Sequence, residues 1–192
     1  IWPWQEMEAR ERLRRIRDAG VVGMCGAGFS THIKLAVRNP KRLRYVLVNG
    51  TECEPYMTSD YRRMLESPEE LVEGLRIVLS LFERATGIFA IEDNKRDAIT
   101  AIQLASGSES RMEVRVLETK YPQGAERMLI YACTGAEINS SQLPADAGCI
   151  VLNVETLHAI YEALVLGRPV TRRAVTVTGK ALKAPKNLLI PI

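Results

Sequence analysis

Apolar residues along the chain form two kinds of pattern, short continuous runs and longer stretches in which they recur at helical spacing. The runs favour buried strands, and the spaced stretches favour helices with one apolar face. We predict strands over residues 44–49, 88–91, 114–117 and 149–152, with a further extended segment over 174–178. We predict helices over residues 6–19, 31–37, 67–85, 94–105, 124–134 and 155–166. Strands that alternate with helices predict an α/β layered fold, with a mainly parallel sheet flanked by helices.

The end of the chain departs from this alternation. After about Arg172 comes an extended segment and then a basic, proline-containing tail. We therefore predict one domain over residues 1–172 and the start of a following domain, or a linker, over residues 173–192. Because the sequence begins with Ile1 rather than Met, we expect it to be one part of a longer protein.

The composition is that of an ordinary globular domain, with 46% hydrophobic and 26% charged residues among 192. The formal charge of +3 is too small to suggest a nucleic-acid-binding surface. Arginines cluster over residues 10–17, and we interpret them as the solvated face of a helix in preference to a binding patch. No stretch approaches the roughly 20 apolar residues that a membrane span needs, and the start shows no signal-peptide pattern.

The four cysteines, Cys25, Cys53, Cys133 and Cys149, form no C-x-x-C pair. Their spacing gives no reason to expect a metal ion or an iron–sulfur cluster within this segment. We expect free thiols in a reducing compartment.

A glycine-rich loop over residues 23–29, with the sequence GMCGAGF, is the first candidate for chemistry. Glycines allow the backbone to approach a ligand closely, and amides ahead of a helix can hold a phosphate. Lys34, one or two turns into the next helix, can neutralise such a phosphate. Taken alone, the loop is equally typical of a tight turn, and Lys34 of a solvated helix residue.

A polar loop over residues 48–56, with the sequence VNGTECEPY, follows a predicted buried strand. Ligands in open α/β sheets bind beyond the carboxyl ends of strands. The Asn49 amide suits the edge of a heterocycle, and the carboxylates of Glu52 and Glu54 suit ribose hydroxyls or a carboxamide. The alternative is a polar surface turn with a solvated Glu54.

Four segments, in chain order, resemble the motifs of one family. Residues 23–34 are similar to G-x-G-G-A-G-F-P-T-x-x-K, and residues 48–56 to the N-x-x-E-x-E-P loop. Residues 121–126 (YPQGAE) resemble Y-P-Q-G-G-E, and residues 153–156 match N-V-E-T. With these motifs the sequence resembles the C subunit of Rnf-type electron-transfer complexes, which is related to the flavin-bearing, NADH-oxidising subunit of respiratory complex I.

The resemblance implies a Rossmann-like, FMN-binding α/β domain on which NADH meets the flavin. Ten residues would bind FMN: Gly23, Gly26, Gly28, Lys34, Asn49, Thr51, Tyr121, Gly124, Asn153 and Thr156. Three others would form the NADH pocket: Phe29, Glu52 and Glu126. No side chain needs to act as a catalytic acid or base, because the cofactor supplies the chemistry. The [4Fe–4S] clusters of the family would lie in regions outside this chain.

The resemblance also implies partners and a location. The partners would be NADH, the other subunits of a membrane electron-transfer complex, and ferredoxin or a similar carrier. The location would be cytoplasmic, at the inner face of the cell membrane through those subunits. Three alternatives stay open: a cobalamin-reducing flavoprotein, another soluble electron-transfer flavoprotein, or a docking domain that has lost FMN. The last rests on Cys25, which stands where the family usually has glycine.

Overall fold

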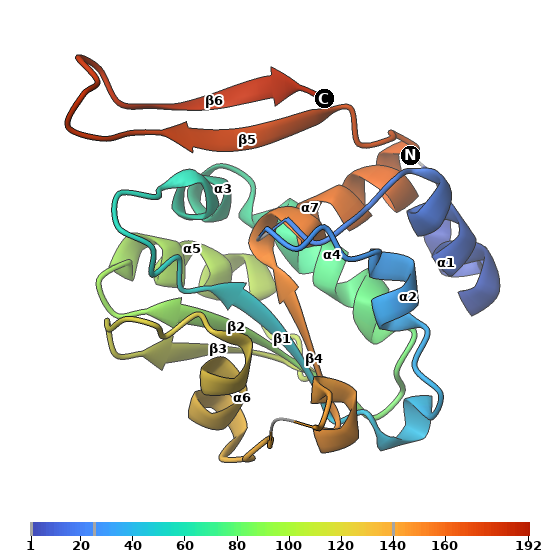
Figure 1. The fold of residues 1–192 in the computed structure, drawn as a ribbon. Helices are drawn as coiled ribbons and strands as arrows, with labels where there is room; N and C mark the ends of the chain where they lie inside the picture. The colour runs from blue at the N-terminus through green and yellow to red at the C-terminus, as the bar shows by residue number, and fades with distance from the viewer. Residues whose placement is uncertain (1, 25, 140) are drawn as a thin grey trace.

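The computed structural model describes residues 2–24, 26–139 and 141–192. Its centre is a four-stranded, fully parallel sheet in the order β3-β2-β1-β4 (Figure 1). The strands are β1 (Tyr45–Gly50), β2 (Thr86–Glu92), β3 (Met112–Leu117) and β4 (Cys149–Asn153). The predicted α/β fold with a parallel sheet is therefore confirmed, and each of the four predicted strands lies within two residues of its observed bounds.

Helices cover both faces of this sheet (Figure 1). They are α1 (Ala9–Asp18), α2 (Thr31–Leu35), α3 (Ser59–Glu66), α4 (Pro68–Leu79), α5 (Arg96–Ser106), α6 (Glu126–Thr134) and α7 (Val154–Tyr161). A π-helical turn, Glu162–Leu166, continues α7, and short 3-10 turns span Trp4–Glu6, Pro40–Arg42 and Pro144–Ala147. Within the described residues, no helix is long and apolar enough to cross a bilayer.

Several predicted helix boundaries were wrong. Helix α1 begins three residues after the predicted start, because a 3-10 turn precedes it. Helix α6 begins at Glu126, so Gly124 lies in the preceding turn. Helix α4 ends at Leu79 and not near residue 85. The side chain of Arg111 donates to the carbonyl oxygens of Leu79 and Ala85 at 3.2 and 2.8 Å, so a distant residue satisfies carbonyl groups at and beyond the end of α4.

Helix α3 was not predicted, although residues 58–60 (TSD) are of types that favour a helix start. The residue before it, Thr58, makes no side-chain capping bond. Instead the carboxylate of Glu52 accepts hydrogen bonds from the amides of Asp60 and Tyr61, at 2.8 and 3.1 Å. A side chain from the preceding loop thus satisfies the first turn of α3.

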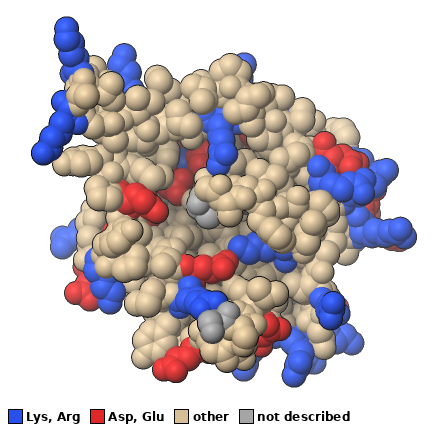
Figure 2. All heavy atoms as spheres, viewed as in Figure 1, with Lys and Arg blue, Asp and Glu red and all other residues tan. Residues whose placement is uncertain are grey.

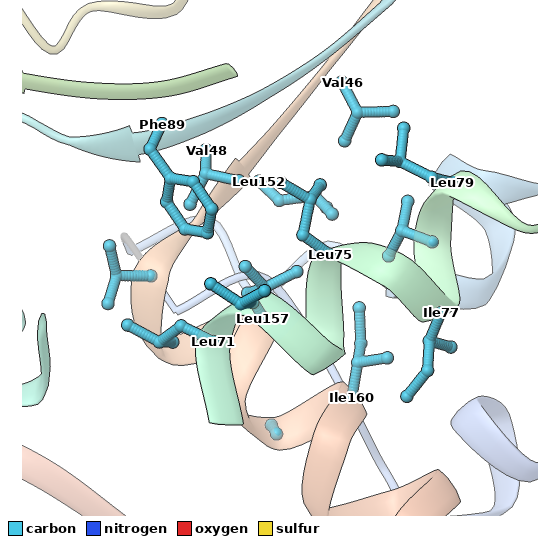
Figure 3. Packing of buried hydrophobic residues seen from close by; sticks show 14 of the residues in the cluster. Val46, Val48, Leu71, Leu75, Ile77, Leu79, Phe89, Leu152, Leu157 and Ile160 are labelled. Carbon is cyan, nitrogen blue, oxygen red and sulfur yellow. The ribbon is translucent and has the colours of Figure 1, made fainter. Parts of the chain in front are cut away.

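The main core lies between the sheet and helices α4 and α7. Figure 3 shows Val48, Phe89 and Leu152 from the sheet facing Leu75 of α4 and Leu157 of α7. The opposite face of the sheet packs against α6. Two of the free cysteines lie in that second layer, Cys133 and Cys149, and burial raises the pKa of each thiol to about 11.

Helices α4 and α7 approach each other closely at Gly74. A Cβ atom at this position would lie 2.6 Å from the backbone oxygen of Leu157. Only a residue without a Cβ allows this spacing, which fixes α7 against α4 and so places the start of α7 relative to the sheet.

The last part of the chain forms a separate antiparallel hairpin, β5 (Arg172–Val177) with β6 (Lys186–Pro191). Strand β6 was not predicted, and it occupies the segment interpreted as a tail. The hairpin contacts the body of the molecule through Thr58, whose amide donates to Thr176 Oγ1 at 3.2 Å. It also does so through Arg173, which donates to the Met24 carbonyl at 2.8 Å. The division into domains at residue 172 stays a prediction.

Candidate functional site

The segments singled out in the sequence meet at the carboxyl edge of the sheet. Asn49 and Asn153 are paired residues at the ends of β1 and β4. The glycine loop is tied to this edge by Thr156 in the first turn of α7, whose Oγ1 accepts from the Met24 amide at 3.0 Å and donates to the Val22 carbonyl at 3.3 Å. The fold therefore brings together residues from positions 22 to 156.

Asn49 joins the loop after β1 to the turn before α6. Its Nδ2 donates to the Gly124 carbonyl at 2.9 Å, and its Oδ1 accepts from the amide and hydroxyl of Thr51 at 3.2 and 2.8 Å. Gly124 N in turn contacts Cys53 Sγ at 3.3 Å. A Cβ at Gly124 would lie 2.6 Å from Thr51 Oγ1 and force a neighbouring side chain to move, so this junction favours a glycine.

Glu52 faces inward, and its carboxylate is engaged with the start of α3. Its backbone adopts a left-handed conformation with φ of +46°, uncommon for a residue with a Cβ. Burial raises the pKa of this carboxyl, and the two α3 amides act against that rise. Glu54, two residues later, is exposed. The predicted contact of Glu52 with NADH stays a prediction, and the observed carboxylate already has two protein donors.

Asp60 is a buried site residue that the sequence did not reveal. Its Oδ2 accepts from Asn153 Nδ2 at 2.6 Å, while Asn153 Oδ1 accepts from the Glu155 amide at 2.9 Å and so caps α7. Burial, followed by the nearby Glu52 carboxylate, raises the pKa of Asp60 to about 8. In the sequence it looks like any acid in the first turn of a helix, because its burial depends on α7 packing above it.

Lys34 and Glu126 form an ion pair of 2.9 Å between α2 and α6. The pair brings a predicted phosphate ligand into contact with a predicted NADH ligand. Both side chains are partly exposed, and the rings of Phe29 and Tyr121 are exposed as well. Figure 2 shows acidic and basic side chains interspersed around the middle of this face.

The glycine loop has the backbone that its composition suggests. Gly26 and Gly28 have φ values of +109° and +61°, which residues with a Cβ rarely adopt. Gly23 N donates to the Phe29 carbonyl at 2.8 Å and closes the loop. Cys25, on which the docking-domain alternative rests, lies outside the described residues.

The donors and acceptors at this edge fit a flavin nucleotide. Among the described residues, none accepts a hydrogen bond from the amides of Ala27 and Phe29, and none partners the buried Oε1 atom of Gln123. Loop amides and the ammonium group of Lys34 suit a phosphate, and amide edges suit a heterocycle. The part of the chain that is described contains no group of three or more His, Cys, Asp or Glu residues able to hold a metal ion.

A parallel sheet whose carboxyl edge gathers a glycine loop, amide donors and a capped helix start defines a nucleotide-binding α/β domain. The chain belongs to the Nuo51 FMN-binding domain family, whose pattern matches residues 16–162.

Curated relatives agree with the resemblance to the Rnf-type family. The chain is 46% identical over 189 residues to the C subunit of the proton-translocating ferredoxin:NAD(+) oxidoreductase complex of Clostridium ljungdahlii. It is 45% identical over 188 residues to the C subunit of the Na(+)-translocating ferredoxin:NAD(+) oxidoreductase complex of Acetobacterium woodii. Both matches cover 98% of this chain but only 41% and 42% of the relatives. The chain therefore spans about two fifths of their length.

The fold also matches a solved structure, an NAD+-reducing [NiFe]-hydrogenase in the air-oxidized state, with a TM-score of 0.80. The match covers 99% of this chain and 38% of the other, at 21% sequence identity. At this identity the likeness concerns the fold alone.

Proposed function

We propose that this chain is the flavin domain of a membrane-associated electron-transfer complex, and that it passes electrons between NADH and iron–sulfur centres or ferredoxin. The observation that carries the proposal is the meeting of the glycine loop, the Asn49 loop, the 121–126 turn and the α7 start at one sheet edge. The curated relatives are subunits of ferredoxin:NAD(+) oxidoreductase complexes, which favours this function over cobalamin reduction.

The chain's own residues would bind and orient the cofactor. The glycine loop and Lys34 would hold the FMN phosphate, and Asn49, Gly124 and Asn153 would border the ring. Bound FMN supplies hydride acceptance from NADH and release of single electrons. The protein would fix the ring, shield it from water and place polar groups beside the ring atoms whose charge changes on reduction.

The partners and the location follow from the same proposal. NADH would reach the exposed side, near Phe29 and Glu126. Ferredoxin and [4Fe–4S] clusters would belong to other subunits or to other parts of the full protein, and residues 173–192 would begin a following domain. The complex would hold this domain at the inner face of the cell membrane.

The test is an FMN titration of the full-length protein, followed by fluorescence or calorimetry, and then anaerobic addition of NADH. We expect saturable binding with a Kd below about 10 µM and bleaching of the flavin absorbance by NADH. Lys34→Met should weaken binding about tenfold or more, because it removes a charged phosphate partner, whereas Lys41→Met, in the short turn after α2, should not.

Each other outcome has a distinct meaning. No saturable binding contradicts the flavin assignment and favours a docking domain that has lost FMN. Binding without bleaching favours a relay domain that another protein reduces. Equal affinity of the Lys34→Met and Lys41→Met variants shows that the phosphate is held elsewhere.

A further inference from the structure

A buried lysine lies beneath the loop that follows β1. Lys95, between β2 and α5, is 8% exposed. Its ammonium group donates to the Thr51 carbonyl at 2.6 Å and lies 3.2 Å from Asn94 Oδ1 and 3.4 Å from Glu92 Oε2. The three acceptors match the three donors of an ammonium group. A buried charge is tolerated only where hydrogen-bond or ion-pair partners of this kind surround it. The cluster around Lys95 is therefore a specific feature of the structure.

The bond from Lys95 fixes the direction of the peptide between Thr51 and Glu52. This peptide is trans, since the cis bond found among the described residues is Tyr121–Pro122. In a trans peptide the carbonyl and the next N–H point in opposite directions. With the Thr51 carbonyl held towards Lys95, the Glu52 amide points away from it, and no described residue accepts a hydrogen bond from that amide.

The conformation of Glu52 makes such a support necessary. A left-handed φ of +46° in a residue with a Cβ is costly and persists only where surrounding bonds hold it. Here the backbone is held by Lys95 on one side and the Glu52 side chain by α3 on the other. A hydrogen bond from a charged donor is stronger than a neutral one, so Lys95 is a firm anchor of this peptide.

We propose that Lys95 is a positioning residue of the flavin site: it presents the Glu52 amide to an acceptor atom of the bound flavin ring. This inference rests on the proposed function. Because Lys95 already fixes the direction of the Glu52 amide in the flavin-free protein, ordering this amide costs no free energy of binding. The fixed positive charge behind the loop also favours the added negative charge of a reduced ring, and so raises the flavin midpoint potential.

The experiment separates this role from a purely structural one. Removing Lys95 alone would leave the buried carboxylate of Glu92 unpaired and destabilise the protein. The informative comparison is therefore Glu92→Gln against Glu92→Gln/Lys95→Met in the full-length protein. Lys120→Met, which removes an exposed lysine from the loop after β3, is the control.

We expect the double variant to bind FMN about tenfold or more weakly than Glu92→Gln, with a more negative midpoint potential by spectroelectrochemistry. In the flavin-free protein, hydrogen exchange should be faster over residues 46–57. Glu92→Gln/Lys95→Arg, which restores a buried cation, should recover most of the potential. Lys120→Met should match the wild type in all three measurements.

Three results overturn the inference, and they differ from one another. If the wild type binds FMN and the folded double variant keeps the affinity, potential and exchange of Glu92→Gln, Lys95 has no positioning role. If the wild type does not bind FMN, the proposed function fails and this role falls with it. A double variant that loses only thermal stability, with unchanged affinity and potential, also refutes the proposal.

Discussion

Gly74→Ala tests whether the close approach of α4 and α7 fixes the start of α7. The added Cβ would lie 2.6 Å from the Leu157 oxygen and 3.2 Å from its Cγ. Because the oxygen belongs to a helix backbone, relief requires the two helices to separate by roughly 0.8 Å. Alanine in a helix interior gains about 1 kcal/mol over glycine, whereas overpacking costs about 1–3 kcal/mol. Since backbone is displaced, we expect the upper part of this range and a net loss of about 1–2 kcal/mol.

The assay is thermal unfolding of the flavin-free protein, where such a loss lowers Tm by about 2–8 °C for a domain of this size. Thr100→Ala, on the exposed face of α5, is the control, because it gains helix propensity without a steric conflict. Its Tm should change by less than about 2 °C. A Gly74→Ala variant that is more stable than wild type, as propensity alone would make it, refutes the reasoning.

Four further substitutions, one of them a control, test the edge of the sheet. Relative to wild type, Asp60→Asn should stabilise the flavin-free protein increasingly as pH rises from about 4 to 8. The reason is that Asp60, with a pKa near 8, holds its proton more tightly in the native state than in the unfolded state, so wild type loses stability over this range. A Tm difference between the two proteins that does not change with pH contradicts this. Gly124→Ala should lower the unfolding free energy by about 1–3 kcal/mol through its contact with Thr51. Gly23→Ala, whose methyl group meets atoms no nearer than 3.6 Å, should leave it within about 0.5 kcal/mol, and equal urea midpoints would refute the contrast. Asn153→Ala should cost about 0.5–2 kcal/mol by removing the cap of α7, and an unchanged urea midpoint would show that the cap does not contribute.

Local signals predicted the sheet and most helices. The start of α4 is an example, because the residues that favour a helix start there are adjacent in the sequence: Ser67, Pro68 and the two acids that follow. Strands β1, β2 and β4 were predictable because their apolar runs face both sides of a covered sheet, whereas the edge strand β3 alternates apolar and charged residues. The motifs also marked the residues that the fold brings to one edge, including Asn49, Asn153 and Thr156.

The features that escaped prediction depend on partners far along the chain. Helix α3 takes its first-turn acceptor from Glu52, and α4 ends where Arg111, 32 residues later, reaches its last carbonyl. Asp60 and Lys95 have ordinary sequence surroundings, and their burial follows from elements packed above them. A sequence pattern that spans one or two helical turns cannot predict such contacts.

The carboxylate of Glu52 makes the loop after β1 and helix α3 inseparable. The two donors are main-chain amides, so they depend on where α3 begins and not on its side chains, whereas the acceptor depends on an acid at position 52. A graft of this site onto another scaffold therefore has to carry the loop together with a helix that starts at the same place, because otherwise the buried carboxylate would lose its donors.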